Sequence, residues 1–131
     1  MGSSVALELQ REGWDVTVVD ENEDALSRLG DGWPGSFIVG HGMDTDLLRD
    51  SGIEEADAVV VATDGDNTNI IIGQVAHKRF DVRCVVVRVL DPARAKFYSG
   101  RGLDVVCPTS VSIDRLLESA RTCALAPAAN D

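Results

Sequence analysis

Residues 1–22, MGSSVALELQREGWDVTVVDEN, hold a helix, a turn and a strand in that order. Apolar residues recur at helical spacing over 3–12, and Gly13 ends that pattern. Residues 15–20 are rich in β-branched side chains and finish on the carboxylate of Asp20. In a parallel α/β sheet a helix that leads into a strand follows an earlier strand, and only Met1 precedes this helix. The stretch therefore predicts an α/β unit whose first strand is absent from the sequence.

The glycine at the start of this helix and the acid at the end of the strand have the spacing of a dinucleotide-binding motif. Gly2 and Asp20 match the last glycine and the acid of a Gly-x-Gly-x-x-Gly fingerprint. In that motif the amides of Gly2 and Ser3 point at a pyrophosphate. Asp20, with Glu21 beside it, binds the ribose hydroxyls, which favours NAD(H) or ATP over NADP. The alternatives are an ordinary Gly-Ser helix start and a strand-end acid that caps the next helix.

Strands and helices alternate along the rest of the chain. The predicted strands are 15–20, 36–40, 58–63, 84–89 and 104–107, and the predicted helices are 3–12, 22–30, 44–51, 67–79, 92–100 and 110–124. This alternation predicts an α/β fold with a Rossmann-like, doubly wound parallel sheet of order 3-2-1-4-5-6. Only strands 2 to 6 of that order are present. Two central strands, 15–20 and 58–63, are therefore expected to lack a partner on one edge, so that the chain alone does not complete the sheet.

The composition argues against a nucleic-acid-binding protein and against a membrane-spanning chain. The chain has 131 residues and a net charge of −10, which argues against nucleic acid as a partner because that binding needs a basic surface. No apolar run approaches the roughly 20 residues of a membrane span. We expect one domain over 1–125 and a tail over 126–131. The three cysteines lack metal-site spacing and are expected to be small buried side chains of a protein in a reducing compartment.

Three consecutive motifs resemble a known family. They are VVDENEDAL at 18–26, the long run IVGHGMDTDLLRDSGIEEADAVVVATDGDNTNI at 38–70, and VVVRVLDP at 85–92. In this order they resemble the nucleotide-binding domain, called KTN or RCK_N, of Trk-type potassium-uptake regulators. The resemblance implies a cytoplasmic regulatory subunit that binds NAD(H) or ATP/ADP and gates a membrane potassium transporter subunit. It also implies a homodimer, or a heterodimer with a related regulator, held at the inner face of the membrane through the transporter.

The same resemblance bears on the missing strand. Members of the family begin with a strand and Gly-x-Gly-x-Val-Gly, and Met1-Gly2 falls on the final Val-Gly. A GTG codon can encode valine or act as a start codon that is translated as Met. We therefore expect the natural start to lie upstream of Met1, with a trimmed product as the alternative.

Further site residues follow from the family pattern. The loop that contains His41 and Gly42 borders the adenine in the family, where an acid commonly stands at the position of His41. Asp44 is expected to cap the next helix instead of contacting ligand. His41 as a metal ligand or base is disfavoured because no second ligand or nucleophile is spaced to join it.

The strand over 58–63 leads into a second group of family positions. Thr63 and Asn69 match nucleotide-contacting positions, and Asp66 matches a helix cap. Arg88 ends an apolar strand, where an isolated charge needs a partner. That partner is a nucleotide phosphate or an acid of another chain, unless the side chain simply points outward.

The final helix offers an apolar stripe at helical spacing, which is either core or a dimer contact. Its members are Val111, Ile113, Leu116, Leu117 and Ala120.

We favour a regulator that is not an enzyme. A dehydrogenase would need a proton-transfer group, and Tyr98 has no lysine four residues later. The other alternative is an interaction module that partners a full-length regulator without binding nucleotide.

Overall fold

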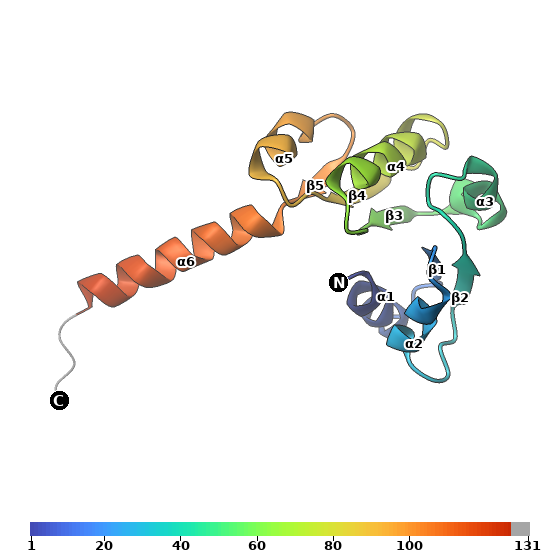
Figure 1. The fold of residues 1–131 in the computed structure, drawn as a ribbon, viewed down its shortest axis with the longest axis horizontal. Coiled ribbons are helices and arrows are strands. Elements are labelled where there is room, and N and C mark those ends of the chain that lie inside the picture. The colour runs from blue at the N-terminus through green and yellow to red at the C-terminus, as the bar shows by residue number, and fades with distance from the viewer. Residues whose placement is uncertain (127–131) are drawn as a thin grey trace.

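The computed structural model of the protein describes residues 1–126 and has two parallel sheets (Figure 1). The strands are β1 (Thr17–Asp20), β2 (Ser36–Val39), β3 (Ala58–Val61), β4 (Cys84–Arg88) and β5 (Asp104–Val106). The helices are α1 (Gly2–Arg11), α2 (Leu26–Leu29), α3 (Thr45–Asp50), α4 (Asp66–Lys78), α5 (Pro92–Tyr98) and α6 (Pro108–Leu125), with short 3₁₀ turns at η1 (Glu23–Ala25) and η2 (Ile53–Glu55). The alternation that the sequence predicts is confirmed, with most element ends displaced by one or two residues.

Local side chains set several of these boundaries. Asp44 accepts hydrogen bonds from the amides of Asp46 and Leu47 and begins α3, so its predicted capping role is confirmed. Asp91 caps α5, and Pro92 occupies the first turn of that helix, where its missing N–H costs nothing.

The break between the two sheets lies where the first strand was predicted to be missing. β1 pairs with β2, and β3 pairs with β4, which in turn pairs with β5. No pairing joins β1 to β3 within residues 1–126. β1 and β3 are therefore both edge strands. Val61 at the end of β3 is buried in the core, whereas β1 has no buried residue.

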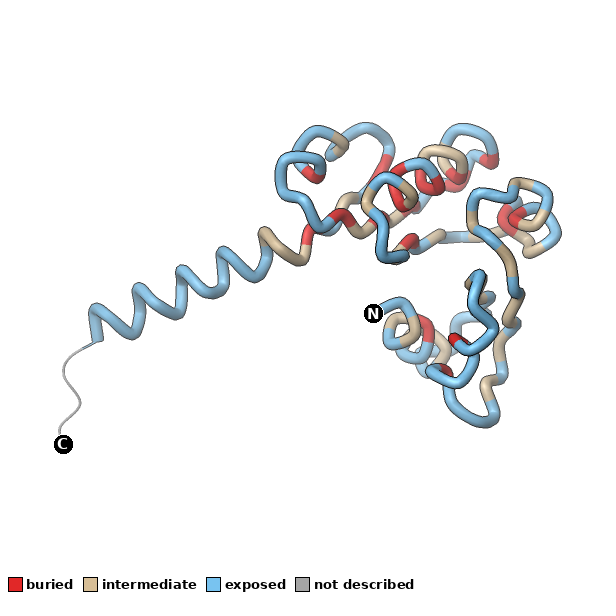
Figure 2. Tube along the Cα trace, in the orientation of Figure 1, coloured by how far each residue is buried: buried red, intermediate tan, exposed pale blue. Residues whose placement is uncertain are grey.

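The core of the molecule lies in the β3–β5 sheet and the helix α4 that packs on it (Figure 2). Val85, Val87 and Val89 are buried on one side of the β4 segment, whereas Val86 between them is only half-buried. This sheet is therefore covered more completely on one face than on the other. In the N-terminal part, the buried apolar residues before residue 48 are limited to three, Ala6, Ala25 and Leu29.

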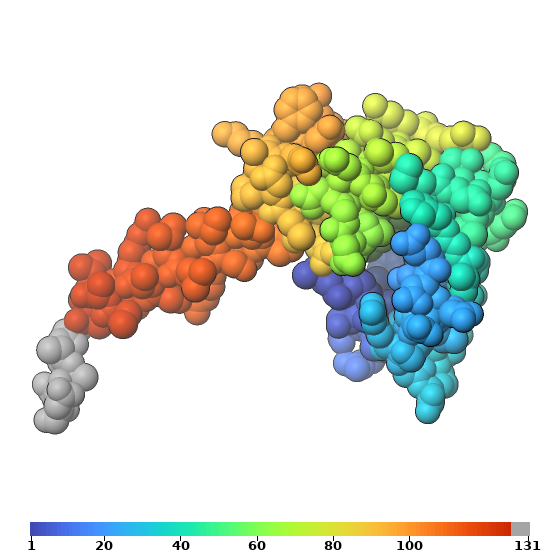
Figure 3. Space-filling model, viewed as in Figure 1, coloured from blue at the N-terminus to red at the C-terminus, as the bar shows by residue number. Residues whose placement is uncertain are grey.

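Helix α6 extends away from the rest of the molecule as a separate arm (Figures 1 and 3). None of its residues is buried, and Leu116 at its middle is 69% exposed. The reading of its stripe as core is therefore wrong for the described chain. Of the predicted tail over 126–131, residues 127–131 lie outside the described residues. In the described part of the chain, no helix is long and apolar enough to cross a membrane.

The cysteines differ from the expectation. Cys107 is buried and caps α6 through its sulfur, whereas Cys84 and Cys123 are exposed. Their burial was predicted for all three and holds only for Cys107.

Candidate functional site

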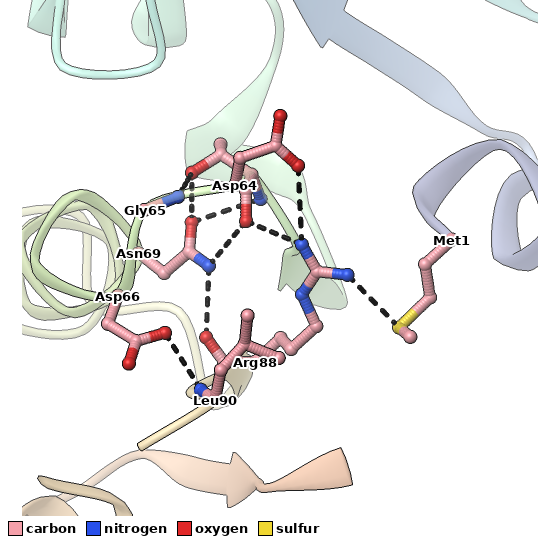
Figure 4. Close-up of polar contacts among 8 residues, drawn as sticks. Met1, Asp64, Gly65, Asp66, Asn69, Arg88 and Leu90 are labelled. Carbon is pink, nitrogen blue, oxygen red and sulfur yellow. Dashed lines mark hydrogen bonds and ion pairs between the residues drawn. The ribbon is translucent and has the colours of Figure 1, made fainter. Parts of the chain in front are cut away.

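The carboxyl ends of β3 and β4 meet the start of α1 (Figure 4). A methyl group at Gly2 would lie 4.0 Å from Cβ of Ala62, which follows β3. The sulfur of Met1 lies 3.5 Å from a terminal nitrogen of Arg88, the last residue of β4. α1 begins without a side-chain cap, so the amides of its first turn, including Gly2 and Ser3, are left for an external acceptor. Such a helix start is favourable for an anion.

Asn69 joins the ends of β3 and β4 from within α4. Its side-chain nitrogen donates to the carbonyl oxygens of Thr63 at 3.0 Å and Arg88 at 2.9 Å. Its side-chain oxygen accepts from the amide of Thr63 at 3.0 Å and also from the Thr63 hydroxyl. The side chain is almost fully buried. Asn69 therefore fixes the loop after β3, and its predicted contact with a nucleotide stays a prediction.

Arg88 lies beside this loop and is 14% exposed as a side chain. One terminal nitrogen donates to the Thr63 carbonyl at 2.7 Å and lies 3.8 Å from a carboxylate oxygen of Asp64. Its Nε is buried with no hydrogen-bond partner. The sequence left open that Arg88 points outward into solvent. The structure excludes this alternative, because the side chain is largely buried.

Asp66 does not cap α4, which corrects the sequence-based prediction. Gly65 occupies the cap position, and the Asp66 carboxylate instead accepts from the amides of Leu90 at 2.7 Å and Asp91 at 2.9 Å. Burial by itself would raise the pKa of Asp66. The two amide hydrogen bonds, together with the charges of Arg94 and Arg88, outweigh burial and hold that pKa below its ordinary value. Asp66 thus ties α4 to the loop after β4.

A second polar group lies at the carboxyl ends of β1 and β2. Asp20 ends β1, and one of its oxygens accepts from the amide of Asn22 at 2.9 Å. The Nε2 of His41 lies 3.7 Å from a Glu21 carboxylate oxygen, and its Nδ1 accepts from the amide of Met43 at 3.1 Å. Because Nδ1 accepts, the ring proton of neutral His41 is on Nε2, facing Glu21.

Gly42 lies close to Ile72 of α4. A Cβ at this position would lie 2.8 Å from a methyl carbon of Ile72 on α4, which is too close without a shift. That carbon is the free end of a side chain that can rotate, so this contact alone does not require glycine. The predicted role of Gly42 near an adenine ring stays a prediction.

The predicted site residues fall into two groups at strand ends. Gly2, Thr63, Asn69 and Arg88 meet around the ends of β3 and β4, and Ser3 follows in the same first turn of α1. Asp20, Glu21, His41 and Gly42 lie at the ends of β1 and β2. Sequence reasoning missed the contact of Asp64 with Arg88 and the long-range bonds of Asp66. Residues 1–126 contain no cluster of three or more His, Cys, Asp or Glu suited to a metal ion.

Comparisons with known proteins identify relatives of the chain. A family model described as the TrkA-N domain matches residues 1–109. A Trk system potassium uptake protein TrkA of Streptomyces coelicolor is 38% identical over 117 residues, which is 89% of this chain and 52% of that protein. Its counterpart in Mycobacterium tuberculosis is 32% identical over 123 residues, covering 93% of this chain and 56% of that protein. The chain thus spans about half the length of these curated relatives.

Two solved structures are similar in fold. One is the Kef CTD of Shewanella denitrificans in an AMP-bound form, with a TM-score of 0.77 at 24% identity, covering 95% of this chain and 76% of that one. The other is the NAD(P)-binding domain of an exopolyphosphatase-related protein from Archaeoglobus fulgidus, with a TM-score of 0.73 at 21% identity, covering 92% of this chain and 90% of that one. These likenesses establish a Rossmann-like α/β fold. The family-model match over residues 1–109 and the identity to the two curated relatives show the family: the chain belongs to the TrkA-N domain family.

Proposed function

We propose that this chain is the nucleotide-binding domain of a regulatory subunit of a potassium uptake system. The observation that carries the proposal is the meeting of α1, the Thr63 loop and Arg88 at the carboxyl ends of β3 and β4. Ligands of open parallel sheets bind beyond the carboxyl ends of the strands, where the strand order reverses. The break between β1 and β3 marks that point in this chain.

The ligand that fits is NAD(H) or an adenine nucleotide, ATP or ADP. The uncapped first turn of α1 and the guanidinium of Arg88 supply positive potential for phosphates. Asp20 ends β1 with one carboxylate oxygen on the Asn22 amide, and its other oxygen is the proposed acceptor for ribose hydroxyls. A carboxylate there disfavours the 2′-phosphate of NADP by charge repulsion.

The proposed action is regulation, not catalysis. A nucleotide that binds one arrangement of the domain more tightly shifts the population toward that arrangement, and a membrane potassium transporter subunit at the cytoplasmic face senses the change. The similarity to TrkA proteins supports this role. We propose that two copies, or this chain and a related regulator, pair through α6.

The nucleotide site is tested by isothermal titration calorimetry with NAD⁺, NADH, ATP and ADP. Asp20→Ala is expected to weaken binding by about 1–3 kcal/mol, the cost of a lost charge-assisted hydrogen bond, and to relax the rejection of NADP. Asp15→Ala is the matched control because Asp15 precedes β1, at the strand's other end. Unchanged affinity in Asp20→Ala removes Asp20 from the site, and a wild-type protein that binds no adenine nucleotide contradicts the proposed function.

Pairing through α6 is tested by sedimentation at high micromolar concentration. Leu116→Asp and Leu117→Asp place charges in the stripe, and Thr122→Asp places one on the side of the helix that faces away from these two leucines. Since α6 has no buried residue, the stripe variants should keep the circular dichroism of the wild type. We expect only the stripe variants to lower the sedimentation coefficient. A wild type that stays monomeric with nucleotide present would refute self-pairing.

A further inference from the structure

Arg88 carries a positive charge that the described chain satisfies only in part. One terminal nitrogen donates to the Thr63 carbonyl, but the other lies 3.5 Å from the sulfur of Met1, and a thioether is a weak acceptor. Nε has no hydrogen-bond partner and is buried. A largely desolvated guanidinium with unused donors favours an anion beside it.

The anion that now faces Arg88 is the carboxylate of Asp64. The nitrogen–oxygen distance of 3.8 Å is too long for a hydrogen bond, and the Asp64 side chain is fully exposed. An exposed ion pair of this kind contributes little and is screened by salt. Asp64 lies in the loop between β3 and α4, and its carboxylate faces Arg88 (Figure 4). Because the side chain is fully exposed, rotation about its own bonds takes the carboxylate away from Arg88.

The neighbouring acid is held quite differently. The carboxylate of Asp66 accepts two short amide hydrogen bonds from the loop after β4, and that geometry ties it in place. Of these two acids, Asp66 at the start of α4 is therefore fixed in place, whereas Asp64 in the loop before it can move away from Arg88.

We propose that Asp64 is a resident counter-anion of Arg88 that a phosphate group of the bound nucleotide displaces. The inference rests on the proposed function and specifies how that site responds to ligand charge. To bind Arg88 the phosphate must displace the Asp64 carboxylate, so Asp64 lowers the affinity for phosphorylated ligands and leaves unphosphorylated ones unaffected. The start of α1, next to Arg88, supplies the second donor group for the phosphate.

The test compares ADP with adenosine in calorimetry at low ionic strength. Asp64→Asn removes the charge at nearly constant size, and we expect it to tighten ADP binding by about 1.5–5-fold, the range of exposed ion pairs. Adenosine affinity should stay unchanged, and the gain for ADP should shrink at high salt. Asp15→Asn changes net charge equally, away from the site, and should change neither affinity.

The dependence on Arg88 is tested with a double-mutant cycle. In Arg88→Met, Asp64→Asn should no longer tighten ADP binding. Because Arg88 also holds the Thr63 carbonyl, this variant is checked by circular dichroism, and the ADP–adenosine comparison in Asp64→Asn decides the question if it does not fold.

Two results would overturn the role of Asp64: unchanged or weaker ADP binding in Asp64→Asn, or an equal gain for adenosine. The failure of the proposed function is distinct. Suppose that the wild type binds ADP, that Asp20→Ala weakens ADP binding and that Asp64→Asn does not strengthen it. This result supports the nucleotide site and refutes the counter-anion role of Asp64. If the wild type binds no adenine nucleotide, both the nucleotide site and the role of Asp64 are refuted.

Discussion

The two sheets of this protein are built from similar sequences and are packed very differently. Val87 of β4 is 0% exposed, whereas Val39 of β2 is 51% exposed, although both belong to β-branched strand runs. The difference follows from neighbours: β4 has a strand on each side and α4 on one face, whereas β2 pairs only with β1. Burial in this protein thus depends on what the topology brings alongside a strand, more than on the strand's composition.

The two groups of polar residues at the strand ends differ in the same way. The polar groups at the ends of β3 and β4 are bound to one another through Asn69 and Asp66, so their geometry is set without a ligand. The group at the ends of β1 and β2 is held by short-range contacts such as that of Asp20 with Asn22. The three predictions that follow test this contrast.

The largest effect is expected at Asn69. Asn69→Ala leaves the amide and carbonyl of Thr63 and the carbonyl of Arg88 without their partner, and each buried unmade bond costs roughly 1–3 kcal/mol. We expect a loss of about 3–5 kcal/mol in the free energy of unfolding, measured in urea. Asn67→Ala, on the exposed side of the same helix turn, is the control and should change stability by about 0.5 kcal/mol or less. Equal losses in the two variants would refute the role of Asn69.

A smaller effect separates the two sheets directly. Val87→Ala should cost about 2 kcal/mol because it removes fully buried methyl groups and leaves a cavity. Val39→Ala removes the same groups from an exposed position and should cost less than about 0.5 kcal/mol. Similar losses in both variants, from matched urea denaturation curves, would remove the contrast between the sheets.

The smallest expected effect is the loss of the stability that Asp66 contributes as the pH falls. The folded-state pKa of Asp66 is lowered, so the stability that this carboxylate contributes is fully present above its ordinary pKa of 3.8. That contribution is lost as pH falls below 3.8 through the lowered folded-state value. Wild type should therefore exceed Asp66→Asn in stability at pH 6, and the gap should narrow at pH 3. A gap that is constant or widens toward acid would contradict the amide-bonded carboxylate.

Local chemistry explains which features were predictable from sequence. The β-branched runs locate the strands, and Asp44 and Asp91 cap helices through amides two or three residues away, so both signals lie within a few positions. Asp66 bonds to residues 24 and 25 positions later, and no local pattern records that pairing. The stripe on α6 has the same spacing whether it faces core or solvent, so its exposure also required the structure.

The central claim is that a nucleotide binds at the strand ends between a well-packed sheet and a loosely packed one. Amide hydrogen exchange, measured with and without saturating NADH or ADP, tests it most directly. Without ligand, the amides of β4 should exchange far more slowly than those of β1. With ligand, protection should rise in the first turn of α1, at residues 20–22 and at residues 63–65, and should stay the same within β4. Unchanged protection at all three of these segments would contradict the account.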